Sequence, residues 1–142
     1  MKKVLVLNGP NLNLLGLREP EIYGSLTLLQ LNQLIMEHVA GLSLAVEFFQ
    51  SNHEGALIDR IHQAVGQYDG LIINAAAYTH YSYALLDALL AVGIPAVEVH
   101  LTDITAREDF RRISVLTPAC CAQFYGEGVR SYLKALDFLH QS

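Results

Sequence analysis

The sequence predicts a single α/β domain over residues 1–142, in which helices cover both faces of a parallel sheet. Short apolar segments alternate with amphipathic segments along the whole chain. Most of the apolar segments lack alternating polar residues, which is typical of strands buried on both faces and therefore of parallel sheets. Five such units favour a flavodoxin-like, doubly wound sheet of five strands.

The first half of the chain contains three predicted strands and two predicted helices. Ser25 or Thr27 is a suitable N-cap for the first helix, and Gly41 ends it. Apolar residues spaced three and four apart mark the second helix. In order, these elements are strand 4–7, helix 26–40, strand 44–49, helix 56–65 and strand 71–73.

The second half continues the alternation of helices and strands. Thr79 is the expected N-cap of a helix that stops at Gly93, before Pro95. A short helical segment with three arginines precedes the fifth strand. The remaining elements are strand 96–99, the segment with Arg107, Arg111 and Arg112, strand 113–116 and helix 128–139.

The loop after the first strand, at about residues 9–24, is far longer than the roughly two to six residues usual for such a connection. It contains Arg18 and Tyr23 among glycines, prolines and asparagines. We expect a lid that brings these two side chains over a small polar ligand. An Ω-loop that only covers the sheet edge is the alternative.

Composition excludes several classes of protein. A net charge of −5 and a pI near 5.6 argue against nucleic acid as a partner. The apolar runs are too short to cross a membrane, and a signal-peptide pattern is absent, so a cytoplasmic protein is expected. Cys120 and Cys121 are adjacent and predict core residues rather than a disulfide framework.

The usual cofactor motifs are also missing from the sequence. It has no Gly-x-Gly-x-x-Gly after the first strand, no P-loop and no Gly-x-Ser-x-Gly elbow. Lys2, Lys3 and Lys134 lie near the chain ends, which argues against a Schiff base. The histidines away from the strand ends lack metal-ligand spacing, so neither a cofactor nor a metal is expected.

Polar side chains follow three of the predicted strands. The carboxyl ends of parallel strands meet at one edge, where ligands bind in doubly wound sheets. Arg107 and Arg111 share a helix face and suit an anionic, hydroxylated ligand, although a solvated charged face is the alternative. The residues expected to converge are Asn8, Asn11, Asn74, His80, His100, Thr102 and Arg107.

His100 and Tyr23 are the candidate acid and base. Glu98 lies two residues before His100 on the same strand face and is placed to orient its imidazole. The pKa of a phenol, about 10, must fall roughly three units for Tyr23 to ionise at neutral pH, a cost of about 4 kcal/mol. One arginine at ~4 Å supplies about this much, so Arg18 and Arg107 together are the safer pair. A core histidine and a lid tyrosine without a chemical role remain the alternatives.

Several ordered motifs resemble type II 3-dehydroquinate dehydratase of the shikimate pathway, and the resemblance covers essentially the whole chain. They are Asn8-Gly-Pro-Asn-Leu-Asn-Leu-Leu-Gly16, Arg18-Glu-Pro-Glu-Ile-Tyr-Gly24, Gln50-Ser-Asn-His-Glu-Gly55, Ala77-Tyr-Thr-His80, Glu98-Val-His-Leu101 and Ala106-Arg-Glu-Asp-Phe-Arg111.

The resemblance implies a cofactor-free anti elimination of water from 3-dehydroquinate through an enolate. It implies that Tyr23 removes the proton beside the ketone and that His100 protonates the departing hydroxyl. Arg18 would stabilise the transition state and, with Arg107, the tyrosinate. Asn11 would hold a water against the enolate oxygen.

The resemblance also implies the remaining contacts and the assembly. Asn74, Leu101 and Thr102 would bind the substrate carboxylate, and His80 and Arg111 the ring hydroxyls. Asp87 would reach the site of a neighbouring subunit in a dodecamer of four trimers. The sequence departs from the family pattern at Ala75-Ala76, Tyr81, Asp103 and Thr105.

Two other classes of protein stay open at this point. A flavodoxin-like module that binds a flavin or nucleotide would explain the fold, but no fingerprint supports it. An inactive paralogue that only assembles would be compatible with the altered loop at Ala75-Ala76.

Overall fold

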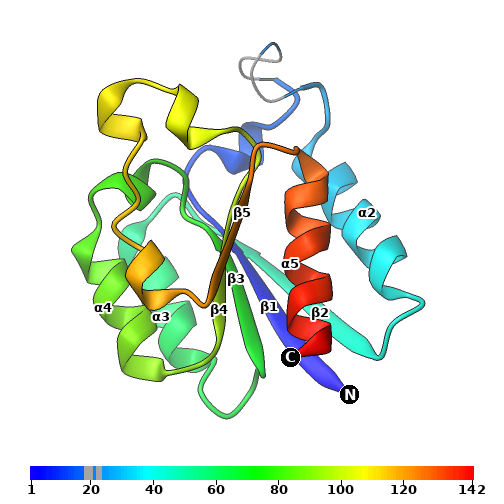
Figure 1. The fold of residues 1–142 in the computed structure, drawn as a ribbon. Coiled ribbons are helices and arrows are strands. Elements are labelled where there is room, and N and C mark those ends of the chain that lie inside the picture. Colours follow the sequence, from blue (N-terminus) through cyan, green and yellow to red (C-terminus); the bar gives the residue numbers. More distant parts are fainter. Residues whose placement is uncertain (18–20, 22–23) are drawn as a thin grey trace.

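The computed structural model describes residues 1–17, 21 and 24–142 and contains one five-stranded sheet (Figure 1). The strand order is β2-β1-β3-β4-β5, and every neighbouring pair is parallel. The predicted flavodoxin-like, doubly wound sheet is therefore confirmed. The strands are β1 (Lys2–Asn8), β2 (Leu44–Gln50), β3 (Gly70–Asn74), β4 (Ala96–His100) and β5 (Ala122–Tyr125).

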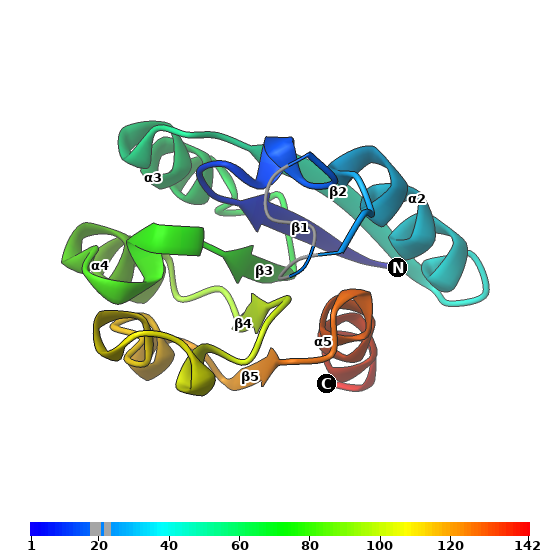
Figure 2. The same cartoon turned by 90° about the horizontal axis from the view of Figure 1, so that it is seen from above.

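Helices cover both faces of the sheet, as the view from above shows (Figure 2). The α-helices of the described chain are α2 (Leu28–Val39), α3 (Glu54–Gln63), α4 (Tyr83–Val92) and α5 (Val129–Gln141). Val4 and Val6 of β1 belong to the core under α2 and α5, whereas Leu5 and Leu7 belong to the core under α3 and α4. Burial on both faces explains why the interior strands β1 and β3 carry long apolar runs.

Helix ends follow the local sequence signals at several places. Thr27 caps α2 in a capping box with Gln30, and Gly93 ends α4 in the left-handed conformation. However, α4 begins at Tyr83 rather than after Thr79, because Ser82 caps it by accepting from the Leu85 N–H. The preceding residues form the 3-10 helix η2 (Ala76–His80).

The predicted strand over residues 113–116 is wrong. The segment is short and mostly apolar, but the Val115 N–H donates to the Thr79 carbonyl at 2.9 Å, and the Leu116 N–H donates to the Ser114 hydroxyl at 3.1 Å. These bonds take the place of a sheet ladder. The pairing with β4 is made further along the chain, by β5.

The arginine-bearing segment is also less regular than a helix. It forms two short 3-10 turns, η3 (Ile104–Ala106) and η4 (Asp109–Arg111). A third turn, η5 (Thr117–Ala119), leads into β5.

The switch in strand order lies between β1 and β3, where the chain leaves toward opposite edges of the sheet. Asn8 and Asn74 end these strands side by side, and the Gly9 N–H donates to the Asn74 carbonyl at 2.8 Å. A Cβ on Gly9 would lie 2.5 Å from the Ala75 carbonyl oxygen, so only glycine fits here.

Within the described ranges, no helix is long and apolar enough to cross a bilayer.

Candidate active site

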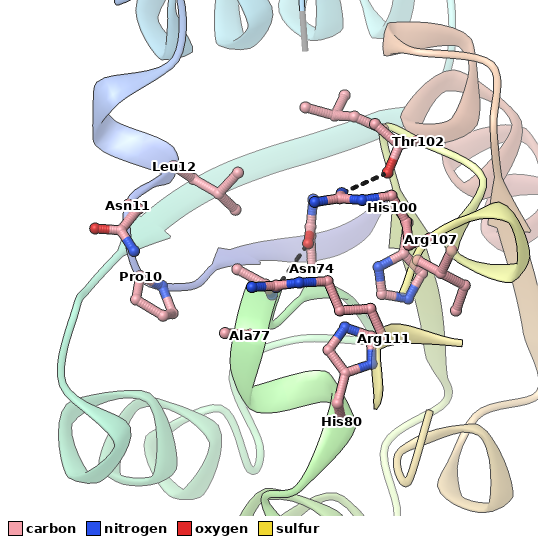
Figure 3. Close-up of a pocket in the computed structure, with 13 residues that line it drawn as sticks. Pro10, Asn11, Leu12, Asn74, Ala77, His80, His100, Thr102, Arg107 and Arg111 are labelled. Atoms are coloured by element: carbon pink, nitrogen blue, oxygen red, sulfur yellow. Dashed lines mark hydrogen bonds between the residues drawn. The ribbon is translucent and has the colours of Figure 1, made fainter. Parts of the chain in front are cut away.

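A pocket opens at the carboxyl ends of β1, β3 and β4, where the doubly wound fold predicts one (Figure 3). Its wall combines amides, two imidazoles and two guanidinium groups with a few apolar side chains. Of the described residues, those that line it are Pro10, Asn11, Leu12, Asn74, Ala76, Ala77, His80, His100, Leu101, Thr102, Ile104, Arg107 and Arg111.

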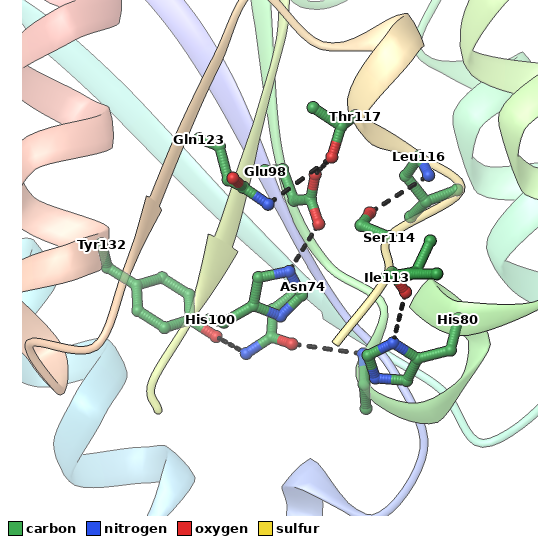
Figure 4. Close-up of polar contacts among 11 residues, drawn as sticks. Asn74, His80, Glu98, His100, Ile113, Ser114, Leu116, Thr117, Gln123 and Tyr132 are labelled. Carbon is green, nitrogen blue, oxygen red and sulfur yellow. Dashed lines mark hydrogen bonds and ion pairs between the residues drawn. The ribbon is translucent and has the colours of Figure 1, made fainter. Parts of the chain in front are cut away.

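His100 and Glu98 form a buried pair at the end of β4 (Figure 4). Nε2 of His100 lies 2.5 Å from Oε2 of Glu98, and their exposed fractions are 5% and 0%. Burial raises the pKa of Glu98, but hydrogen bonds from His100, Ser114 and Thr117 outweigh it and hold that pKa below its ordinary value. Because an ionised carboxylate only accepts, Nε2 carries a hydrogen and Nδ1 is the ring nitrogen left for a ligand.

His80 is the second imidazole of the pocket. Its Nδ1 lies 2.8 Å from the Ile113 carbonyl oxygen, which can only accept, so Nδ1 is the donor. Burial is the largest influence on its pKa and lowers it, against the opposing effect of the Ile113 bond. At neutral pH, His80 therefore offers Nε2 as an acceptor.

Asn74 is fixed by a buried hydrogen-bond chain. Its Nδ2 donates to the Tyr132 hydroxyl at 2.9 Å, and that hydroxyl donates to Oδ1 of Asn8 at 2.6 Å. Oδ1 of Asn74 accepts from the Ala76 N–H at 3.2 Å. Two direct partners, the Tyr132 hydroxyl and the Ala76 N–H, thus set which way the amide faces (Figure 4).

Asn11 lies on the rim of the pocket, in a left-handed conformation with φ 69°. Asparagine tolerates this region better than most residues. Its N–H donates to Oδ1 of Asn52 at 3.0 Å, and Gln50 donates to the same oxygen and to the Gly9 carbonyl. The motif after β2 therefore supports the motif after β1.

The two arginines give the pocket its positive charge. Nη1 of Arg107 donates to the Thr102 hydroxyl at 3.5 Å (Figure 3). Nε of Arg111 lies 3.1 Å from Oε2 of Glu108. The Arg111 guanidinium also lies over the Phe110 ring, 4.8 Å from its centroid. Two guanidinium groups beside polar walls suit an anionic ligand.

Most of the predicted site residues converge at this pocket, but not all of them. Glu98 lies behind His100, and Asp87 is exposed on α4 and does not line the pocket. Arg18 and Tyr23 lie outside the described residues. The predicted residues that do line it are Asn11, Asn74, His80, His100, Leu101, Thr102, Arg107 and Arg111.

Sequence reasoning missed the residues that hold the site from behind. Tyr132 reads as one apolar position of an amphipathic helix, and its hydroxyl reaches Asn8 and Asn74 only because α5 lies against the end of β1 and β3. Ser114 lies within the segment wrongly predicted as a strand, and Thr117 follows that segment with no local pattern to mark its contact with Glu98.

Comparison with known proteins decides the family. A family model described as dehydroquinase class II matches residues 2–140. The chain belongs to the class II dehydroquinase family. It is 57% identical to the 3-dehydroquinate dehydratase of Caldicellulosiruptor saccharolyticus, over 99% of this chain and 98% of the relative. The resemblance recognised in the sequence is thereby confirmed.

Solved structures agree with this class II dehydroquinase assignment. The type II dehydroquinase from Butyrivibrio crossotus has a TM-score of 0.95 and 48% identity over 97% of both chains. A 3-dehydroquinate dehydratase-like protein from Bifidobacterium longum has a TM-score of 0.74 and 34% identity, over 99% of this chain and 97% of that one.

The departures from the dehydroquinase family pattern have local compensations. Ala76 has a positive φ of 52°, and its N–H donates to Oδ1 of Asn74 at 3.2 Å, a bond that holds the Ala75-Ala76 loop. Asp103 and Thr105 depart together, and Oδ1 of Asp103 accepts from the Thr105 N–H at 3.0 Å and from its hydroxyl at 2.5 Å.

The described residues contain no group of three or more His, Cys, Asp or Glu side chains that could hold a metal ion.

Proposed function

We propose that this chain catalyses the anti dehydration of 3-dehydroquinate to 3-dehydroshikimate through an enolate, without a Schiff base or metal. The observation that carries the proposal is His100 on the wall of a pocket with two guanidinium groups, paired with the buried Glu98 behind it. This arrangement supports a proton-donor role for His100 beside a surface that suits an anion. Membership of the class II dehydroquinase family and 57% identity to a 3-dehydroquinate dehydratase support the choice of substrate.

The proton transfers follow from the residues in their proposed roles. The Tyr23 phenolate takes the proton from the carbon beside the ketone, and the electron pair moves onto the carbonyl oxygen as an enolate. When the enolate collapses, the C–O bond breaks and His100 gives its proton to the departing oxygen, which leaves as water. Transfer of the proton from Tyr23 back to His100 restores the starting state.

The pocket side chains have proposed parts in binding and charge stabilisation. Arg18 and Arg107 stabilise the tyrosinate, and Asn11 holds a water against the enolate oxygen. Asn74, Leu101 and Thr102 bind the substrate carboxylate. His80 and Arg111 bind ring hydroxyls, a role that suits a neutral imidazole with a free acceptor nitrogen.

The activity is tested by mixing the purified protein with 3-dehydroquinate and following the ultraviolet absorbance of the conjugated enone. A parallel sample is treated with borohydride in the presence of substrate. We expect the enone to form and the activity to survive borohydride, since no imine is present to reduce. A well-folded protein that forms no enone at any substrate concentration would be an inactive paralogue.

The assembly is part of the proposal. Asp87 is exposed on α4, where Tyr83 and Leu90 are also 66% and 57% exposed, and such an apolar surface suits a subunit contact. We propose a dodecamer of four trimers in which Asp87 reaches a neighbouring site. A cytoplasmic location stays a prediction.

Mixed oligomers test the role of Asp87. Asp87→Ala and Tyr23→Phe chains should each be inactive alone, but co-expressed chains should recover activity, because some sites then combine an intact Tyr23 with an intact Asp87 from the neighbour. If the co-expressed chains stay inactive while forming mixed oligomers of the wild-type size, Asp87 does not act across subunits.

A further inference from the structure

The segment from residue 113 to 119 contacts His80 directly and reaches His100 through Glu98 (Figure 4). The Ile113 carbonyl accepts from His80, and the Thr117 hydroxyl donates to Oε1 of Glu98 at 2.7 Å. The other carboxylate oxygen of Glu98, Oε2, is the one bound to His100. Thr117 and His100 therefore each bind a different oxygen of the Glu98 carboxylate.

A buried carboxylate needs such partners. Glu98 is fully buried, and burial is the largest influence that raises its pKa. The hydrogen bonds from Ser114 and Thr117 act in the opposite sense and favour the ionised form. Without them, Glu98 would be free to turn about its side chain or to take up a proton, and Nε2 of His100 would lose an ionised acceptor.

The hydroxyl groups are carried on a rigid segment. Leu116 is fully buried, the Val115 N–H bonds the Thr79 carbonyl, and the Leu116 N–H bonds Ser114 Oγ. Pro118 restricts the backbone next to Thr117. Gln123 of β5 donates to Thr117 Oγ1 at 3.5 Å, so the hydroxyl accepts from one side and donates to Glu98 on the other.

We propose that Thr117, assisted by Ser114, is a positioning residue that keeps Glu98 ionised and aimed at His100. Thr117 does not line the pocket, so it acts on the reaction only through Glu98. This inference rests on the proposed function for its effect on turnover, but the state of the Glu98 carboxyl is a property of the free protein.

The test compares Thr117→Val, which removes the hydroxyl at constant shape, with Thr117→Ser, which keeps it. We expect Thr117→Val to lower kcat by roughly tenfold with KM little changed, since a hydrogen bond to a charged group is lost away from the substrate. The deficit should grow as pH falls, because Glu98 then takes up a proton at higher pH than in the wild type. Thr117→Ser should restore both kcat and its pH dependence.

A double-mutant cycle separates positioning from a general structural effect. In a Glu98→Gln background no carboxylate is present, so Thr117→Val should cost little further. Equal losses in both backgrounds, or a loss independent of pH that Thr117→Ser does not restore, would overturn the proposal. If Thr117→Val folds poorly, Ser114→Ala replaces it as the test variant. Ser114→Ala should show a smaller loss of kcat with the same pH trend.

Carbon-13 NMR of protein labelled at the glutamate carboxyl tests the inference without turnover, with Glu98→Gln identifying the resonance. Thr117→Val should raise the titration midpoint of Glu98 by roughly one pH unit. An unchanged midpoint would overturn the proposal even in an active enzyme. A raised midpoint in a protein that does not dehydrate 3-dehydroquinate would support the positioning role while refuting the proposed function.

Discussion

His100 and Glu98 lie two residues apart on β4, and their side chains meet at 2.5 Å between Nε2 and Oε2, with His100 on the wall of the pocket and Glu98 behind it. Strand geometry makes the meeting possible, because residues i and i+2 point to the same face. Hydrogen bonds hold the pKa of the Glu98 carboxyl below its ordinary value although the side chain is fully buried. This pair links the fold to the proposed chemistry.

The charge of Glu98 should matter for turnover. Glu98→Gln keeps the size of the side chain but removes its charge, and we expect kcat to fall by roughly 30-fold, since a charge-assisted hydrogen bond contributes about 2 kcal/mol. KM should change little because Glu98 does not line the pocket. Steady-state kinetics check this, and an unchanged kcat would remove Glu98 from the mechanism.

Arg18 is expected to act mainly in the transition state, where charge develops on Tyr23 and the enolate. Arg18→Ala should therefore lower kcat by a larger factor than it raises KM. Measuring kcat and KM of Arg18→Ala beside the wild type checks this prediction. A rise in KM alone would assign Arg18 to binding instead.

The hydroxyl of Tyr132 is expected to support both stability and substrate binding. Tyr132→Phe leaves the Asn8 and Asn74 amides without their shared partner, at an expected cost of about 1–3 kcal/mol in the free energy of unfolding. KM should also rise, because Asn74 lines the pocket. Tyr125→Phe, at a residue with 38% exposure, is the matched control and should leave the urea midpoint unchanged.

His80 predicts a pH dependence of stability. Its pKa is lowered in the folded protein from the ordinary histidine value of about 6.5, so the unfolded chain binds more protons as the pH falls below that value. Stability contributed by neutral His80 should therefore be lost as pH falls through about 6.5. Urea unfolding at several pH values should show a weaker acid-side loss in His80→Gln than in the wild type. Equal pH dependence in the two proteins would mean that His80 does not contribute.

Asp103 is expected to weaken substrate binding slightly. It lies between two pocket residues, Thr102 and Ile104, and carries a negative charge near the site of an anionic substrate. Asp103→Asn removes the negative charge but keeps an oxygen for the Thr105 bonds. KM should therefore fall, by severalfold at most because an exposed charge interacts weakly, while kcat stays constant. The effect should shrink at high salt. A higher KM would show that the turn needs the carboxylate.

The sequence predicted the parts of the structure that depend on burial and strand order. Apolar strands specified the parallel sheet, and the parallel sheet specified where Asn74, His80 and His100 would meet. The fifth strand was misplaced because residues 113–116 are a short, mostly apolar run, while their hydrogen bonds go to Thr79 and to Ser114 itself. That choice depends on tertiary contacts that a local pattern does not contain.

The same reason explains which site residues were missed. Tyr132 and Thr117 lie 124 and 19 residues from their partners Asn8 and Glu98, and neither belongs to a recognisable motif. Their roles follow only from where the chain places them. Motif residues were easier to find because their chemistry is visible in the side chain itself.

The most direct test of the central claim is the rate of enone formation from 3-dehydroquinate by the wild type, Tyr23→Phe and His100→Asn, measured side by side on folded samples of equal concentration. The account predicts rapid enone formation by the wild type and none by Tyr23→Phe, since the base is absent. It predicts that His100→Asn, which retains the base, loses enone formation but still exchanges the hydrogen beside the ketone with deuterated solvent. Enone formation by either variant at a rate near that of the wild type would contradict the assigned roles.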